Sequence, residues 1–214
     1  MKGAEKRMIL ENYYYVFEQA VPNRICNDII KYGEQQSKQM GITGEQNSKV
    51  PTNQEDISKL YKTRNSSIVW MSERWIYRAI LPYVSEANKQ AGWNFEWERS
   101  EACQFTIYRE KQHYTWHKDS QSKPYNNPRN ETHGMVRKLS VTVSLEDGNS
   151  YEGGDLEFDL RNTSDSSPNI ITSKQARKKG SIIIFPSFVW HRVSPVVKGT
   201  RYSLVIWNLG FPFR

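Results

Sequence analysis

The chain has 214 residues, enough for one domain with a substantial core and too few for two comfortable domains. Hydrophobic residues make up 37% and aromatic residues 13% of the chain, which excludes an intrinsically disordered protein and predicts a soluble globular one. The formal net charge of +7 is compatible with a nucleic-acid partner, but the basic residues are scattered, so a solvated basic surface is the favoured interpretation.

Cysteine content and hydropathy predict the cellular compartment of the protein. Cys26 and Cys103 are too few for a disulfide framework or a cysteine-rich metal site, which favours reduced thiols in a cytoplasmic setting. Residues Met1 to Leu10 are not followed by an apolar stretch of signal-peptide length. No run approaches the roughly twenty apolar residues of a spanning helix, so no membrane partner is expected.

The first hundred residues or so are predicted to be mainly helical. After Pro22, apolar residues recur at helical spacing and predict an amphipathic helix to about Lys38. The polar segment Gly41 to Glu55 is predicted to be a loop. A second helix is predicted from Glu73 to Gln90, with a kink or interruption at Pro82.

From about Glu101 the pattern becomes that of a β half, because β-branched and aromatic residues alternate with polar ones between turn signals. The predicted strands are Cys103 to Tyr108, Lys138 to Leu145, Gly154 to Leu160, Ser181 to Phe185, and Arg201 to Leu209. Ser120 to Met135 and Arg161 to Lys179 lack periodicity and are predicted to be long surface loops, which often act as lids or binding segments.

A metal site is predicted from three residues. His117 and Asp119 flank Lys118 on a predicted strand or its end, so both side chains emerge on one face. His191, which closes the apolar strand predicted from Ser181 to Trp190, is the third candidate ligand. Two imidazoles and one carboxylate leave three positions of an octahedral metal open, as in non-heme Fe(II) oxygenases. Catalytic zinc accepts the same ligands, so the residues alone leave the metal open.

A cosubstrate site is predicted beside the metal. A 2-oxoglutarate molecule chelates iron through its keto acid and needs a cation for its far carboxylate. Arg201 supplies a permanent planar charge that holds a carboxylate through two parallel hydrogen bonds. Ser203, on the same strand face, and Tyr108, at the end of an earlier strand, add hydroxyl donors. Each alone has an ordinary structural interpretation, but together with the metal ligands they favour a binding site.

These motifs together resemble the prolyl 4-hydroxylase-like branch of the 2-oxoglutarate/iron(II) oxygenases. The resemblance covers most of residues 100 to 210 and rests on four blocks: Gln104 to Asp119, Arg137 to Leu145, Gly153 to Phe158 with its Gly153-Gly154 pair, and His191 to Trp207. A weaker similarity covers Arg64-Asn65-Ser66, which looks like the Arg-x-Ser segment that contacts peptide substrate in these hydroxylases.

The resemblance implies one dioxygenase domain over residues 1–214 with an α+β fold. Its core, about 101–214, would be a double-stranded β-helix, or jelly roll, supported by N-terminal helices within about 1–100. Iron and 2-oxoglutarate would lie between the two sheets of that core.

The implied function is that of an oxidoreductase, an Fe(II)- and 2-oxoglutarate-dependent dioxygenase that uses O₂ and releases succinate and CO₂. His117, Asp119 and His191 would hold the metal, and Arg201, Tyr108 and Ser203 the cosubstrate. The expected substrate is a prolyl residue of a protein or peptide, contacted by Arg64, Ser66 and Trp207. A role for ascorbate as a reductant stays open.

Two other functions fit parts of the sequence. Oxidative demethylation of nucleic acid shares the triad and would use the positive charge, but it usually brings a second Arg late in the strand that begins at Arg201. Here Val205, Ile206 and Trp207 occupy that region, so nucleic acid is not the favoured partner. The third function is a catalytically silent β-sandwich that binds peptide or sugar, and the intact set of metal ligands argues against it.

Overall fold

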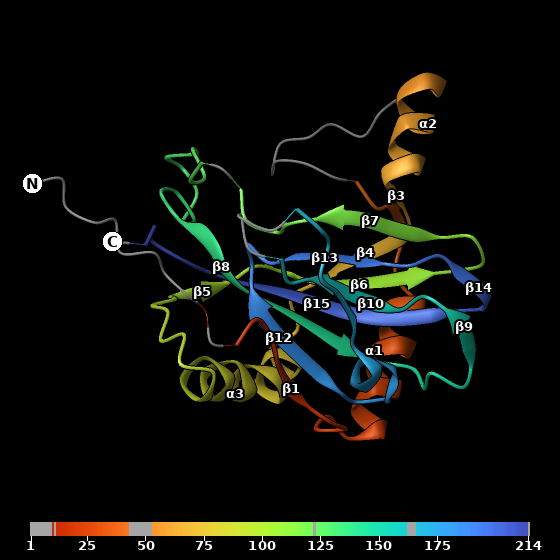
Figure 1. Ribbon diagram of the computed structural model, residues 1–214, viewed down its shortest axis with the longest axis horizontal. Coiled ribbons are helices and arrows are strands. Elements are labelled where there is room, and N and C mark those ends of the chain that lie inside the picture. The colour runs from red at the N-terminus through yellow and green to blue at the C-terminus, as the bar shows by residue number, and fades with distance from the viewer. Residues whose placement is uncertain (1–9, 11, 43–52, 122, 162–165, 214) are drawn as a thin grey trace, which may run out of the picture.

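The computed structural model describes residues 10, 12–42, 53–121, 123–161 and 166–213, and its strands form two facing antiparallel sheets (Figure 1). The larger sheet has the order β1-β12-β8-β15-β6-β4-β2, with β5 beside β15. Its strands are β1 (Tyr15–Phe17), β2 (Gln39–Met40), β4 (Ser67–Met71), β5 (Arg99–Ser100), β6 (Cys103–Tyr108), β8 (Val136–Ser144), β12 (Ile182–Pro186) and β15 (Arg201–Gly210).

The smaller sheet has the order β11-β10-β13-β7-β3. Its strands are β3 (Arg64–Asn65), β7 (His113–His117), β10 (Leu156–Asp159), β11 (Ile170–Thr172) and β13 (Trp190–Val193). A two-stranded ribbon pairs β9 (Tyr151–Gly153) with β14 (Val196–Gly199). All these pairings are antiparallel, and most of them join strands that are distant in the sequence.

Alternation along β6 and β15 separates the core from the functional face of the large sheet. Phe105 on β6 and Leu204 and Ile206 on β15 are fully buried in the main hydrophobic cluster. Their strand neighbours, including Thr106 and Ser203, line a pocket on the other face. Because successive side chains point to opposite faces of a strand, one run of residues supplies both the core and the pocket.

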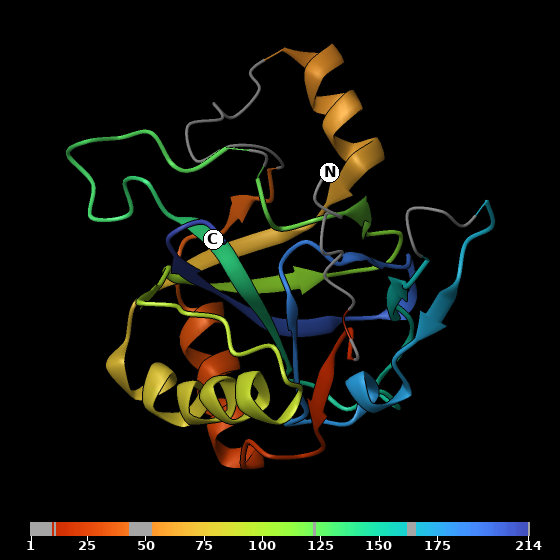
Figure 2. The ribbon, with the colours of Figure 1, turned by 60° about the vertical axis from the view of Figure 1, so that its left-hand side comes forward.

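The core lies between the large sheet and two helices, α1 (Asn23–Glu34) and α3 (Arg74–Gln90), which both lie below the sheet in Figure 2. Ile29 of α1 and Ile76 and Ile80 of α3 are fully buried against it. Full burial of such a side chain stabilises the fold by ~1.5–3 kcal/mol. The helices therefore close one face of the sheet and leave the other face to the site.

The predicted helices differ from the observed ones in detail. Helix α1 ends at Glu34, before the predicted end near Lys38. Helix α3 continues through Pro82, so an interruption there was wrong: Pro82 lies on the exposed face, where water can bond to the carbonyl that the proline leaves free. A further helix, α2 (Gln54–Thr63), was not predicted, although Ile57, Leu60 and Tyr61 recur at helical spacing; only Leu60 among its residues is buried.

The apolar segment Ser181 to Trp190 is not one strand, and that prediction was wrong. Strand β12 ends at Pro186 in the large sheet, residues 187–189 turn, and β13 begins at Trp190 in the small sheet. The chain thus changes sheets just before His191. The register of β13 on β7 then places His191 opposite His117.

The predicted loops are partly confirmed. In residues 120–121 and 123–135 the structure contains no helix or strand. The segment Arg161 to Lys179 was expected to be irregular, but it contains β11 and the short 3₁₀ helix η1 (Lys174–Arg177) in its described part. Residues 43–52, within the predicted loop Gly41 to Glu55, lie outside the described residues, as do residues 1–9 of the N-terminal segment.

The α+β fold with a double-stranded β-helix core is confirmed by the two facing sheets and their supporting helices. Among the helices of the described residues, none has both the length and the apolar content to cross a membrane.

Candidate active site

A pocket lies between the two sheets, on the face of the large sheet away from the helices. It encloses about 420 Å³, its open mouth included. Strands β6 and β15 supply polar side chains from one side, and β7 and β13 supply His117 and His191 from the other. Leu156 and Val193 add apolar wall.

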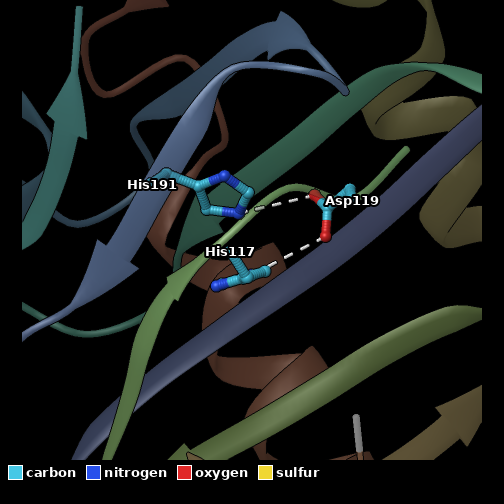
Figure 3. Close-up of side chains that lie close together, drawn as sticks. All are labelled: His117, Asp119 and His191. Carbon is cyan, nitrogen blue, oxygen red and sulfur yellow. Dashed lines mark ion pairs between the residues drawn. The ribbon is translucent and has the colours of Figure 1, made fainter. Parts of the chain in front are cut away.

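His117, Asp119 and His191 meet in this pocket. One potential ligand atom from each lies within 4.8 Å of the others. His117 Nε2 is 3.7 Å from Asp119 Oδ1, and His191 Nε2 is 3.5 Å from Asp119 Oδ2. Figure 3 shows the two rings reaching the carboxylate from two different strands. The backbone N–H of Asp119 donates to the carbonyl of Ser187 at 2.9 Å, which ties this residue to the turn before His191.

Backbone carbonyls orient both imidazole rings. Nδ1 of His117 lies 2.8 Å from the carbonyl oxygen of Thr115, and Nδ1 of His191 lies 3.0 Å from that of Val189. A carbonyl only accepts, so each Nδ1 carries the proton and each Nε2 keeps its lone pair toward Asp119. Such partners fix the tautomer and direction of metal-binding histidines.

The protonation states fit a metal ion. Burial, helped by the nearby His191, lowers the pKa of His117 to about 3, so its ring is neutral at physiological pH. Burial acts to raise the pKa of Asp119, but His191 and His117, together with Arg137 and Ser140, hold that pKa below the ordinary value. A neutral imidazole and an ionised carboxylate are the forms that bind a divalent cation. His117 and Asp119 are therefore in the states that a metal requires.

Arg201 forms a buried cationic site at another wall of the pocket. It begins β15 opposite Tyr108 of β6 and is only 3% exposed. Its Nη1 donates to Ser203 Oγ at 3.1 Å, and its guanidinium lies 5.5 Å from the Tyr108 ring centre. Among the residues that the structure describes, no carboxylate lies within 4.0 Å of Arg201. A buried cation without a counter-charge is costly, so this arrangement suits an anionic ligand.

The three residues predicted to contact substrate lie at different positions relative to the pocket. Arg64 and Trp207 line the same pocket. Ser66 is not on the pocket wall but lies behind Arg64, where its hydroxyl accepts from Arg64 Nε at 3.0 Å. The indole Nε1 of Trp207 is a buried donor without a hydrogen-bond partner in the described structure. Trp207 therefore lines the pocket while its N–H stays buried, and Ser66 acts through Arg64.

Some pocket residues were not predicted as site residues. Gln104 and Thr106 line the pocket from β6, and Tyr114 stacks on the His117 ring with 3.5 Å between ring centres. Alternation along β6 is the signal that points to Gln104 and Thr106, since both share the face of Tyr108. The place of Tyr114 depends on an irregular register between β7 and β13, which no sequence pattern indicates.

Comparison with known families and proteins agrees with this geometry. Residues 103–208 match the sequence model of a family described as the 2OG-Fe(II) oxygenase superfamily. A "PKHD-type hydroxylase" of Synechococcus sp. (strain CC9311) is 45% identical over 69 residues, 32% of this chain and 28% of that protein. Another, from Pseudoalteromonas atlantica, is 30% identical over 105 residues, 48% of this chain and 40% of that protein. The chain thus spans less than half the length of these curated relatives.

The fold is similar to that of solved hydroxylases. A Pseudomonas putida prolyl-4-hydroxylase superposes with a TM-score of 0.60 at 17% identity, covering 92% of each chain. The viral collagen prolyl hydroxylase of Paramecium Bursaria Chlorella virus-1 gives a TM-score of 0.60 at 16% identity, covering 94% of this chain and 97% of that one. At such identities the similarity concerns the fold, and both proteins share it over nearly their whole length.

Proposed function

The chain belongs to the 2OG-Fe(II) oxygenase superfamily, and from this premise we propose that it hydroxylates a C–H bond of a prolyl residue in a protein or peptide. Fe(II) and 2-oxoglutarate are the metal and cosubstrate that the family and the His-Asp-His triad imply. The observation that carries the proposal is a metal-ligand triad that shares one pocket with Arg201, which has no carboxylate within 4.0 Å among the described residues.

Three residues would hold the iron. His117 and His191 point Nε2 toward the metal position, because each Nδ1 faces a backbone carbonyl, and Asp119 presents its carboxylate between them. When bound, iron with 2-oxoglutarate and O₂ supplies the oxidising chemistry, in which the cosubstrate becomes succinate and CO₂ and the substrate gains a hydroxyl group. The protein contributes the position and protonation state of the ligands.

Arg201, Ser203 and Tyr108 would hold the cosubstrate. A guanidinium binds a carboxylate through two parallel hydrogen bonds, and its planar shape sets the direction of approach. Ser203 holds one end of the guanidinium, and Tyr108 packs beside it. Leu156 and Val193 keep water from this part of the pocket, which strengthens the charge interaction.

Trp207 supports contact with the ring of a prolyl residue, because this aromatic side chain lines the pocket. The prolyl assignment also draws on the fold neighbours, two of which are named prolyl hydroxylases.

The test is anaerobic reconstitution of the purified protein with Fe(II) and 2-oxoglutarate, followed by exposure to O₂ with prolyl peptides. We expect succinate formation that depends on iron, and a peptide product heavier by one oxygen atom. Substitution His191→Ala should abolish metal binding. His113→Ala is the matched control, because His113 lies on β7 outside the pocket wall. Equal iron affinity in the two variants would contradict the proposal.

A further inference from the structure

Arg64 is a second buried cation in the pocket. It is 4% exposed, and its three nitrogens each donate to a neutral acceptor: Nε to Ser66 Oγ at 3.0 Å, Nη1 to the carbonyl of Ile42 at 3.1 Å, and Nη2 to Gln104 Oε1 at 2.6 Å. Within the part of the chain that the structure describes, no carboxylate lies within 4.0 Å of this guanidinium. Its charge is therefore held in place, and no described carboxylate compensates it.

Its position places this charge near the metal ligands. The Arg64 guanidinium lies 4.6 Å from the centre of the Tyr114 ring, and that ring stacks on His117 at 3.5 Å with an interplanar angle of 13°. Only the Tyr114 ring therefore separates Arg64 from His117 of the triad. It begins β3 of the small sheet, whereas Arg201 begins β15 of the large sheet, so the two cations serve different parts of the pocket.

The surroundings of Arg64 are closely built. A Cβ atom added at Gly41 would lie 2.7 Å from Arg64 Nε and 2.3 Å from Ser66 Oγ, so the absence of a side chain there lets the backbone pack against both. The Gly41 N–H donates to the carbonyl of Ser66 at 2.9 Å. A guanidinium has five N–H groups, and three are used, which leaves one on each terminal nitrogen for a ligand.

The pocket wall holds more arginines than carboxylates. Two arginines, Arg64 and Arg201, line it together with one carboxylate, Asp119, which is proposed to bind the metal. Arg201 is the cation proposed for the cosubstrate, so the remaining charge belongs to Arg64. The nearby Arg137 does not add to it, since Glu101 is its partner.

We propose that Arg64 binds a carboxylate of the substrate, so that the substrate class is an acid that carries its carboxylate close to the hydroxylated carbon. Such a substrate is a free amino acid, or a peptide whose terminal or side-chain carboxylate enters the pocket. A charge-assisted pair with a fixed guanidinium is about twice as strong as a neutral hydrogen bond, which gives an acid an advantage over a neutral peptide carbonyl. The inference rests on the proposed function, because it assigns the substrate part of the same pocket.

A matched pair of small ligands tests the charge directly. The protein, loaded anaerobically with Fe(II) and 2-oxoglutarate, is titrated by calorimetry with N-acetyl-L-proline and with its neutral primary amide, N-acetyl-L-prolinamide. We expect the acid to bind at least about tenfold more tightly than the amide. Arg64→Gln should remove this preference, and Arg64→Lys, which keeps the charge but not the planar fork, should retain part of it.

The control variant is Arg192→Gln. Arg192 loses the same charge, but it pairs with Glu157 and does not line the pocket, so its removal should leave the preference unchanged. Equal affinity for acid and amide, failure of both to bind, or equal weakening of both by Arg64→Gln overturns the inference. The comparison in the unsubstituted protein needs no variant to fold. Binding of iron and 2-oxoglutarate is measured on the same samples. If neither binds, the proposed function is contradicted. If both bind but the acid is not preferred over the amide, only this inference is contradicted.

Discussion

The guanidinium of Arg137 lies 3.9 Å above the centre of the Trp207 indole ring, on the wall of the pocket. Glu101 holds that guanidinium through two hydrogen bonds of 3.0 and 2.5 Å, and the hydroxyl of Tyr125 donates to the same carboxylate at 2.6 Å. A cation over an indole contributes ~0.5–2 kcal/mol. The long loop that contains Tyr125 is therefore connected, through one buried ion pair, to the residue proposed to meet the substrate.

This ion pair leads to a prediction about stability. Glu101→Gln keeps the shape of the side chain but leaves Arg137 buried without its counter-charge, and we expect it to lower the free energy of unfolding by about 3 kcal/mol. Glu131→Gln is the matched control, because Glu131 pairs with Arg99 at the exposed surface and should change stability by less than ~1 kcal/mol. Urea denaturation of both variants measures the difference, and similar losses would show that the Glu101 pair has no special role.

The metal site leads to a second prediction. Asp119→Asn preserves the size of the side chain but removes the negative charge between His117 and His191, so affinity for Mn(II), used as a redox-stable probe, should fall by at least about 100-fold. Asp147→Asn, at an exposed turn residue, should leave metal affinity unchanged. Isothermal titration calorimetry distinguishes the two. Retention of metal by the Asp119 variant would remove this carboxylate from the site.

The cosubstrate site leads to a third prediction. Arg201→Gln should weaken 2-oxoglutarate binding by about 100-fold without changing metal affinity, since loss of a bidentate charged pair costs ~2–3 kcal/mol. Arg109→Gln removes an exposed arginine just beyond β6 and should have little effect. Equilibrium dialysis of 2-oxoglutarate on the metal-loaded proteins provides the measurement. A joint loss of metal and cosubstrate binding would indicate that Arg201 supports the fold instead.

The backbone conformation at Gly154 leads to a fourth prediction. Its φ is +63°, and an added Cβ would lie 2.9 Å from Val196 Cγ2 and 3.1 Å from Arg201 Cδ. Gly154→Ala should cost ~1–3 kcal/mol through backbone strain and crowding, and it should weaken 2-oxoglutarate binding by displacing Arg201. Gly92→Ala carries the same kind of strain, with φ of +73°, but meets no atom within 4 Å. Thermal denaturation should show a loss of stability in both variants, whereas only Gly154→Ala should lose affinity for 2-oxoglutarate.

The two cysteines lead to a fifth prediction. Burial raises the pKa of Cys26 and of Cys103 to about 11, so the reactive thiolate is scarce near neutral pH. A disulfide-exchange reagent should therefore label neither thiol in the folded protein and both after denaturation. Absorbance of the released thiol follows the reaction. Rapid labelling before denaturation would mean that these residues are accessible in solution.

Local patterns in the sequence were sufficient for much of the fold. The alternation in Cys103 to Tyr108 predicted β6 with its exact bounds, and Arg201 to Leu209 predicted β15 to within one residue. Helix α3 was predicted because its apolar residues repeat at helical spacing. Helix α2 was missed although Ile57, Leu60 and Tyr61 recur at helical spacing, because it is short and begins within the polar segment that was predicted to be a loop.

The sequence by itself determined the chemistry available to this protein: two histidines and an aspartate with metal-ligand spacing, an arginine that begins an alternating strand, and a family resemblance around them. Tertiary structure alone decided that β12 and β13 belong to different sheets, which brings His191 opposite His117. It also decided that Arg64 shares their pocket. Spacing along a strand sets which side chains share a face, whereas contacts between distant segments depend on hydrogen-bond register and packing between sheets, which no local pattern encodes.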